Sequence, residues 1–135
     1  MKLVVDTNVV VAAILKSGLT RELFFTRGLF LYSPDKLKIE LLKYREEFMQ
    51  KSGLTESEFN SVAELVLDRV KIVPIEEYEV YAYEAKRISP DDGDWEFFAV
   101  ALCKSCALWS SEKKLKDQQR VSVYSTLDLL DLLRR

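Results

Sequence analysis

Short apolar segments alternate along this chain with longer segments of helical periodicity, and this alternation restricts the possible folds most strongly. Residues 3–5, 29–32, 71–75, 107–109 and 121–124 are expected to form strands. Strands that are separated by helices pair in parallel, and a parallel sheet needs helices on both of its faces. The sequence therefore predicts an α/β protein, with a three-layer α/β/α arrangement around a central parallel sheet.

The helical segments are identified by apolar periodicity and by residues that favour helix ends. Helices are expected at residues 7–16, 20–27, 34–50, 55–69, 76–88, 95–103, 111–116 and 126–134. Ser33 followed by Pro34 predicts the start of the third helix, because serine is a favoured N-cap and proline fits the first turn. The segment 95–103 is apolar on nearly every side, so we expect it to be buried. Four phenylalanines are expected in the core: Phe24, Phe25, Phe97 and Phe98.

The chain has 135 residues, of which 48% are hydrophobic and 31% are charged. This length suits one domain, and no linker or repeat is visible, so a single domain over residues 1–135 is expected. The apolar runs are shorter than the roughly 20 residues needed to cross a bilayer. A charge at Asp6 also comes too early for a signal peptide. These features predict a cytoplasmic protein that does not enter a membrane.

The absence of histidine narrows the possible chemistry more than the net charge of −2 does. Without imidazole, Ser-His-Asp hydrolysis, histidine-based RNA cleavage and most catalytic zinc sites are excluded. The net charge argues against strong non-specific binding to nucleic acid, which needs an excess of Lys and Arg. It does not argue against a nuclease whose acids gather at a metal site. Any catalysis must therefore rely on carboxylates, hydroxyls, lysine or thiols.

Acidic residues stand where three predicted elements would meet at one edge of the sheet. Asp6 directly follows the first strand, and Ser110 and Glu112 follow the strand at 107–109. Functional groups of open parallel sheets gather beyond the carboxyl ends of the strands. Asp94 begins the helix that leads into the strand at 107–109, so it should lie near the same edge. We expect these groups to converge if the two strands are neighbours. The loop after the first strand has no glycine, which argues against a dinucleotide or phosphate-loop site.

Three segments, taken in order, resemble the motifs of PIN-domain nucleases. Residues 3–8 (LVVDTN) resemble the opening motif of that family, and residues 94–101 (DWEFFAVA) resemble its third acidic motif. Residues 108–112 (LWSSE) resemble the fourth motif, in which a hydroxyl residue precedes an acid. The second acid of the family lies on an intervening helix, where Glu40 is the best match. The resemblance spans nearly the whole chain.

This resemblance implies a ribonuclease that hydrolyses RNA phosphodiester bonds with Mg²⁺ or Mn²⁺ as its cofactor. Asp6 and Asp94 would be the main metal ligands, Glu40 would bind metal or orient the attacking water, and Glu112 would hold a second ion. Hard divalent ions accept oxygen ligands of this kind without imidazole. The groups expected to hydrogen-bond the ligands or the phosphate are Thr7, Asn8, Ser110 and Asp91.

Each acid also has a structural interpretation that stays open at this point. Asp6 could cap the helix that follows it, and Asp92 is expected to serve only the start of a helix. Glu40 could be a solvated helical residue. Glu112 departs from the family, which usually has aspartate there, so it is open whether a second ion is held. The ordered set of motifs favours the catalytic interpretation.

Many short stand-alone members of the family resemble VapC-like toxins of toxin–antitoxin pairs, and this chain is similar to them in size. That resemblance implies an antitoxin protein as partner and a homodimer. A housekeeping RNA-processing nuclease would have the same residues, and Glu112 keeps open a non-catalytic interaction module of the same fold. A receiver domain phosphorylated at Asp6 is a further alternative, but Glu40 and Asp94 fit it poorly.

Overall fold

The computed structural model describes residues 1–134 and, within that range, contains a five-stranded parallel sheet in the order β3-β2-β1-β4-β5. Its strands are β1 (Lys2–Val5), β2 (Phe30–Pro34), β3 (Val70–Val73), β4 (Ala107–Trp109) and β5 (Val123–Tyr124). The first strand, β1, lies at the centre of the sheet. β2 and β3 lie on one side of it, and β4 and β5 lie on the other. The predicted parallel sheet is therefore confirmed, including the neighbouring positions of β1 and β4.

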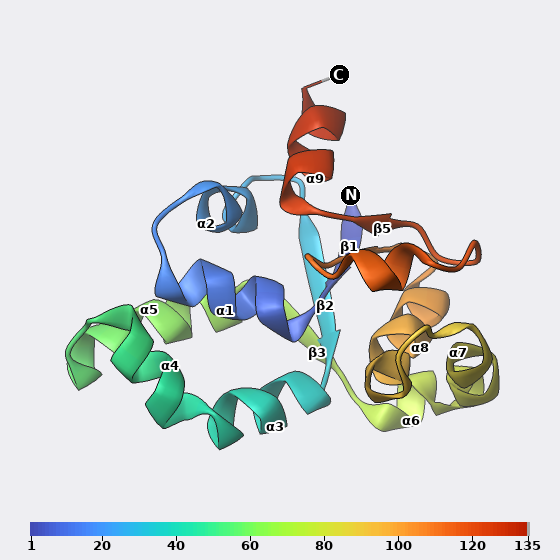
Figure 1. The fold of residues 1–135 in the computed structure, drawn as a ribbon, viewed down its shortest axis with the longest axis horizontal. Coiled ribbons are helices and arrows are strands. Elements are labelled where there is room, and N and C mark those ends of the chain that lie inside the picture. The colour runs from blue at the N-terminus through green and yellow to red at the C-terminus, as the bar shows by residue number, and fades with distance from the viewer. Residues whose placement is uncertain (135) are drawn as a thin grey trace.

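Helices cover both faces of this sheet and complete the predicted three-layer α/β/α arrangement (Figure 1). One face carries α1 (Thr7–Leu15), α2 (Leu19–Phe24), α3 (Lys36–Lys43), α4 (Arg45–Ser52) and α5 (Glu56–Asp68). The other face carries α6 (Ile75–Tyr78), α7 (Ala82–Ile88) and α8 (Trp95–Lys104), while α9 (Thr126–Leu133) projects at the C-terminal end. No helix of the described part combines the length and the apolar character that a membrane span requires.

The central strand shows why the sheet needs cover on both sides. Leu3 and Val5 belong to the apolar cluster under α1 and α5, whereas Val4 belongs to the cluster under α8. All three side chains are fully buried, as expected where successive residues of a strand point to opposite faces. Burial of each such side chain contributes about 1.5–3 kcal/mol, so the strand that ends at Asp6 is firmly held.

The start predicted for the third helix is wrong. Ser33 and Pro34 continue β2, where Pro34 pairs with Val73, and the helix begins only at Lys36. The Ser33 hydroxyl is buried and donates a hydrogen bond of 3.1 Å to the carbonyl of Val5, on the neighbouring strand. Serine therefore joins two strands here instead of capping a helix.

Two predicted helices are divided in the structure. The segment 34–50 becomes α3 and α4, which meet at Tyr44 and both pack beside α1. The segment 76–88 becomes α6, a 3-10 turn at Glu79–Tyr81, and α7. The predicted helix 111–116 is a 3-10 helix over Lys113–Lys116.

One predicted core residue is not buried. Phe25 is 44% exposed, whereas Phe24 beside it is fully buried and packs against Trp109. A helix as short as α2 presents only one face to the core, and Phe24 occupies that face. The prediction for Phe25 is therefore wrong, while Phe97 and Phe98 are buried as expected.

Candidate functional site

The carboxyl ends of β1 and β4 bring together two residues predicted for the site. Val5 and Trp109 are register partners, and the Asp6 amide donates to the Trp109 carbonyl at 3.0 Å. The first residue after β4, Ser110, donates its hydroxyl to Oδ2 of Asp6 at 2.7 Å. Both side chains are almost fully buried. They lie where the strand order reverses, which is the usual place of ligand sites in open parallel sheets.

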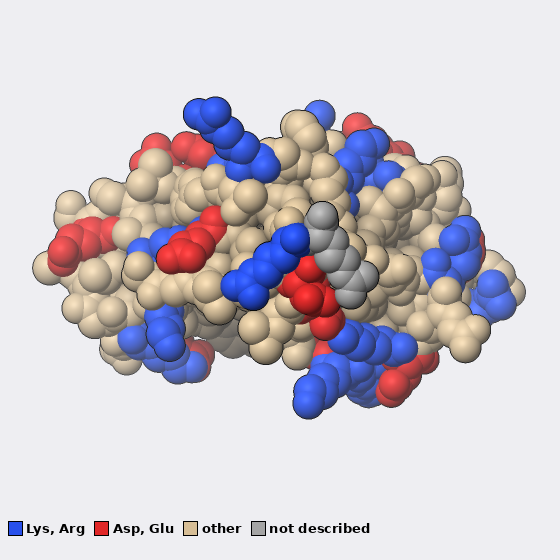
Figure 2. All heavy atoms as spheres, turned by 90° about the horizontal axis from the view of Figure 1, so that it is seen from above, with Lys and Arg blue, Asp and Glu red and all other residues tan. Residues whose placement is uncertain are grey.

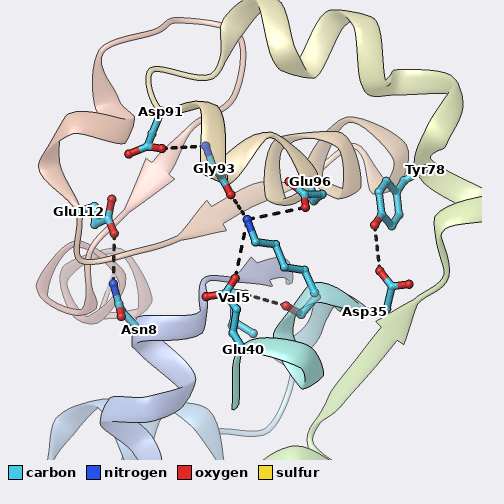
Figure 3. A network of polar contacts seen from close by, with 11 residues as sticks. Val5, Asn8, Asp35, Glu40, Tyr78, Asp91, Gly93, Glu96 and Glu112 are labelled. Carbon is cyan, nitrogen blue, oxygen red and sulfur yellow. Dashed lines mark hydrogen bonds and ion pairs between the residues drawn. The ribbon is translucent and has the colours of Figure 1, made fainter. Parts of the chain in front are cut away.

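Glu112 is held beside this pair by two hydrogen bonds. Its backbone amide donates to the Ser110 hydroxyl at 3.1 Å, and the Asn8 side-chain amide donates to its Oε1 at 3.1 Å (Figure 3). Asn8 lies in the first turn of α1, directly after the end of β1. The residues that follow β1 and β4 thus fix each other at one edge of the sheet.

The turn that precedes α8 adds two more acids. Asp91, Asp94 and Glu112 each have a carboxylate oxygen within 4.8 Å of those of the other two. Oδ1 of Asp91 also accepts the Gly93 amide at 2.8 Å. This is the helix-start role that the sequence pattern assigned to Asp92, which is exposed. Asp91 therefore both shapes the turn and faces the acidic cluster.

Neither of the two main candidate acids caps a helix. Asp6 and Asp94 occupy the N-cap positions of α1 and α8, but neither side chain accepts a capping hydrogen bond. The capping interpretation of Asp6 is therefore wrong. Both carboxylates remain available to face the cluster, and the charges of Asp6 and Glu112 act on Asp94.

Glu40 lies at the same edge on α3, but it is not simply solvated. The Lys36 ammonium lies 3.8 Å from Oε1 of Glu40 and 3.7 Å from Oε2 of Glu96, and it also donates to the Gly93 carbonyl (Figure 3). Sequence reasoning missed Lys36 and Glu96. The four-residue spacing of Lys36 and Glu40 was a signal for the first, and a charge within the apolar helix α8 was a signal for the second.

The electrostatics of the cluster reflect an excess of negative charge. Burial, together with repulsion from Glu112 and Glu40, raises the pKa of Asp6 to about 6 in spite of its bond from Ser110. Burial, together with repulsion from Asp6, Glu112 and Asp91, raises the pKa of Asp94 to about 7. Burial also raises the pKa of Glu40, although Lys36 opposes this shift. These acids would be stabilised by an additional cation.

Two buried oxygen atoms lie near the cluster. Among the described residues, the Thr7 hydroxyl and Oε1 of Glu96 make no hydrogen bond of ordinary geometry, although the Thr7 hydroxyl lies near enough to Glu40 to lower the pKa of that acid. Buried polar atoms usually have a partner, so these two oxygens are exceptions that lie at the candidate site. The edge of the sheet thus offers oxygen ligands only, which suits a hard divalent cation.

Basic side chains do not form one continuous band on the face shown in Figure 2. Seen from above the view of Figure 1, Lys and Arg stand there in separate groups among acidic and uncharged residues. This distribution agrees with the net charge of −2.

Comparisons with known proteins agree with this architecture. The PIN domain family matches residues 4–125, a range that includes the predicted site acids Asp6, Glu40, Asp94 and Glu112. The chain has no significant match among curated proteins. The crystal structure of VapBC2 from Rickettsia felis bound to a DNA fragment from their promoter is similar, with a TM-score of 0.72 at 16% identity. That similarity covers 93% of this chain and 98% of the other, and at this identity it concerns the fold.

Proposed function

The chain belongs to the PIN domain family, and from this membership we propose that it is a metal-dependent ribonuclease that hydrolyses RNA phosphodiester bonds. The observation that carries the proposal is the approach of Asp91, Asp94 and Glu112 to one another beside the buried pair Asp6–Ser110. Acids gathered at the switch point of a parallel sheet, without histidine, suit hydrolysis assisted by a hard cation.

The residues present fit Mg²⁺ or Mn²⁺. The candidate ligands are carboxylates, and burial together with repulsion from neighbouring acids raises the pKa values of Asp6 and Asp94, which a bound cation would oppose. When bound, such an ion lowers the pKa of water and stabilises the negative charge that develops on phosphate oxygens.

The protein's own side chains would then hold and orient the reactants. Asp6 and Asp94 would be the main ligands, with Glu112 completing the set and Glu40 orienting the attacking water. Ser110 would keep Oδ2 of Asp6 in place through its hydrogen bond. Asn8 would do the same for Glu112, and the buried hydroxyl of Thr7 would help to hold Glu40.

A toxin of a toxin–antitoxin pair is the biological role that we propose for this nuclease. The similar Rickettsia felis structure is a VapBC2 assembly, and its similarity extends over nearly the whole of both chains. The proposal includes an antitoxin protein as partner, a homodimer, and one domain over residues 1–135. Expression of the chain alone should arrest growth, and co-expression of the neighbouring gene product should relieve the arrest. Cleavage without growth arrest would favour a housekeeping nuclease.

The activity itself is tested with labelled single-stranded RNA and Mg²⁺ or Mn²⁺. We expect the parent protein to cleave, and EDTA, Asp6→Asn or Asp94→Asn to abolish cleavage. Asp92→Asn removes an exposed charge from the same turn and should leave cleavage unchanged. Binding of Mn²⁺ without cleavage of any RNA would instead indicate a non-catalytic module, and absence of metal binding would refute the site.

A further inference from the structure

We infer that Lys36 is a positioning residue, which fixes Glu40 on α3 relative to Asp94 before α8. This inference rests on the proposed function, because it concerns the acids of the same site. Glu40 and Asp94 stand on segments that are far apart in the sequence and that approach the site from different elements. Their spacing must therefore be set by a contact between these elements.

Lys36 makes that contact. It is the first residue of α3, and its ammonium reaches Glu40 one turn along the same helix at 3.8 Å. Across the site its ammonium donates to the carbonyl of Gly93, the residue before Asp94, and lies 3.7 Å from Glu96, two residues after Asp94 (Figure 3). The side chain is only 26% exposed.

The ammonium is directed toward protein groups. One of its N–H donors bonds the Gly93 carbonyl, and the carboxylates of Glu40 and Glu96 lie at ion-pair distance from it. A lysine that serves a phosphate directly would need a donor directed toward open solvent. The geometry therefore points to a link within the protein rather than to a phosphate contact.

The two possible roles of Lys36, as a positive charge and as a link between two elements, predict opposite effects of its removal on metal binding. Removal of a positive charge beside Glu40 and Glu96 would, by Coulomb's law alone, tighten the binding of a divalent cation. Loss of a link that sets the spacing of Glu40 and Asp94 would weaken it. The sign of the change in Mn²⁺ affinity thus separates the two roles.

The test compares Lys36→Met with Lys38→Met, two substitutions that remove the same charge from the same helix. Lys38 is exposed and lines an apolar pocket with Leu41 and Phe48, and it makes none of the contacts described for Lys36. We expect Lys36→Met to bind Mn²⁺ about 10-fold more weakly by calorimetry, as is usual for groups that orient metal ligands, and Lys36→Arg to recover part of the loss. Lys38→Met should match the parent protein.

A second readout requires no metal. In EDTA, the amides of Gly93 and Asp94 donate to Asp91 within the turn, and their hydrogen exchange should be faster in Lys36→Met than in the parent. Lys36→Gln replaces Lys36→Met if the latter does not fold. Tighter or unchanged Mn²⁺ binding, or unchanged exchange of the two amides, would overturn the inference. If the parent protein itself binds no Mn²⁺, the proposed function fails, and the exchange measurement still decides the role of Lys36.

Discussion

The Ser110 hydroxyl donates a hydrogen bond of 2.7 Å to Oδ2 of Asp6, although the two residues stand 104 positions apart in the chain. The bond joins the first residue after β1 to the first residue after β4. The same hydroxyl oxygen accepts the amide of Glu112 at 3.1 Å. One serine therefore orients the most buried acid of the site and the loop that carries another.

Ser110→Ala should weaken the site without unfolding the protein. The hydrogen bond from Ser110 lowers the pKa of Asp6, so its loss should raise that pKa further above about 6. Since Asp6 must be ionised to hold a cation, the acid limb of the cleavage profile should move to higher pH. Mn²⁺ affinity should fall about 10-fold. Ser111→Ala, at an exposed neighbour, is the control, and an unchanged pH profile in Ser110→Ala would contradict the prediction.

Glu112→Asp should also weaken Mn²⁺ binding, although aspartate is the usual family residue. The longer side chain allows an oxygen of Glu112 to lie within 4.8 Å of those of Asp91 and Asp94, and it accepts the Asn8 amide. Shortening it by one methylene withdraws both contacts, and we expect affinity to fall about 10-fold by calorimetry. The exposed Glu64→Asp serves as the matched control. Affinity equal to or above that of the parent would show that the reach of Glu112 is not needed.

The edge of the sheet could be predicted from the sequence because strand ends and motif order define it. Asp6 and Ser110 each follow a strand, and parallel strands that are neighbours must bring such residues together. Asp94 could be placed because its helix leads into β4. These arguments need only the order of elements, which apolar periodicity reveals.

The contacts within the site required the structure. The link from Lys36 to Gly93 spans 57 positions, and no local pattern encodes such a pair. Ser33 satisfies the local preferences of a helix N-cap, but Ser33 and Pro34 pair with β3, so the strand continues through them. The exposure of Phe25 likewise depends on the length of α2. Local preference is decisive only where tertiary contacts do not oppose it.

Arg69→Met should reduce stability without affecting the site. The Arg69 guanidinium donates to the carbonyl of Phe24 at the end of α2 and to those of Thr26 and Leu29 before β2, at distances from 2.9 to 3.3 Å. Loss of these charged donors leaves partly buried carbonyls unpaired and should cost about 2–3 kcal/mol. Thermal unfolding should report this loss, while Mn²⁺ affinity at low temperature should stay that of the parent. The exposed Arg27→Met controls for the lost charge, and an equal loss there would refute this account of Arg69.

The metal-free protein should lose stability as the pH rises from about 4 to about 7, because the pKa values of Asp6 and Asp94 are about 6 and about 7 in the folded chain against a usual 3.8. Within this window the folded chain binds more protons than the unfolded chain, so the free energy of unfolding falls as the pH rises.

Asp94→Asn removes the half-buried acid and should stabilise the protein in EDTA near neutral pH by about 1 kcal/mol, after allowance for solvent screening. Asp92→Asn should not, and Mn²⁺ should stabilise the parent but not Asp94→Asn. Thermal melts across the pH range measure this change in stability. If the melting temperature of the parent protein rises steadily toward neutral pH in EDTA, repulsion among the acids of the cluster does not destabilise the folded chain.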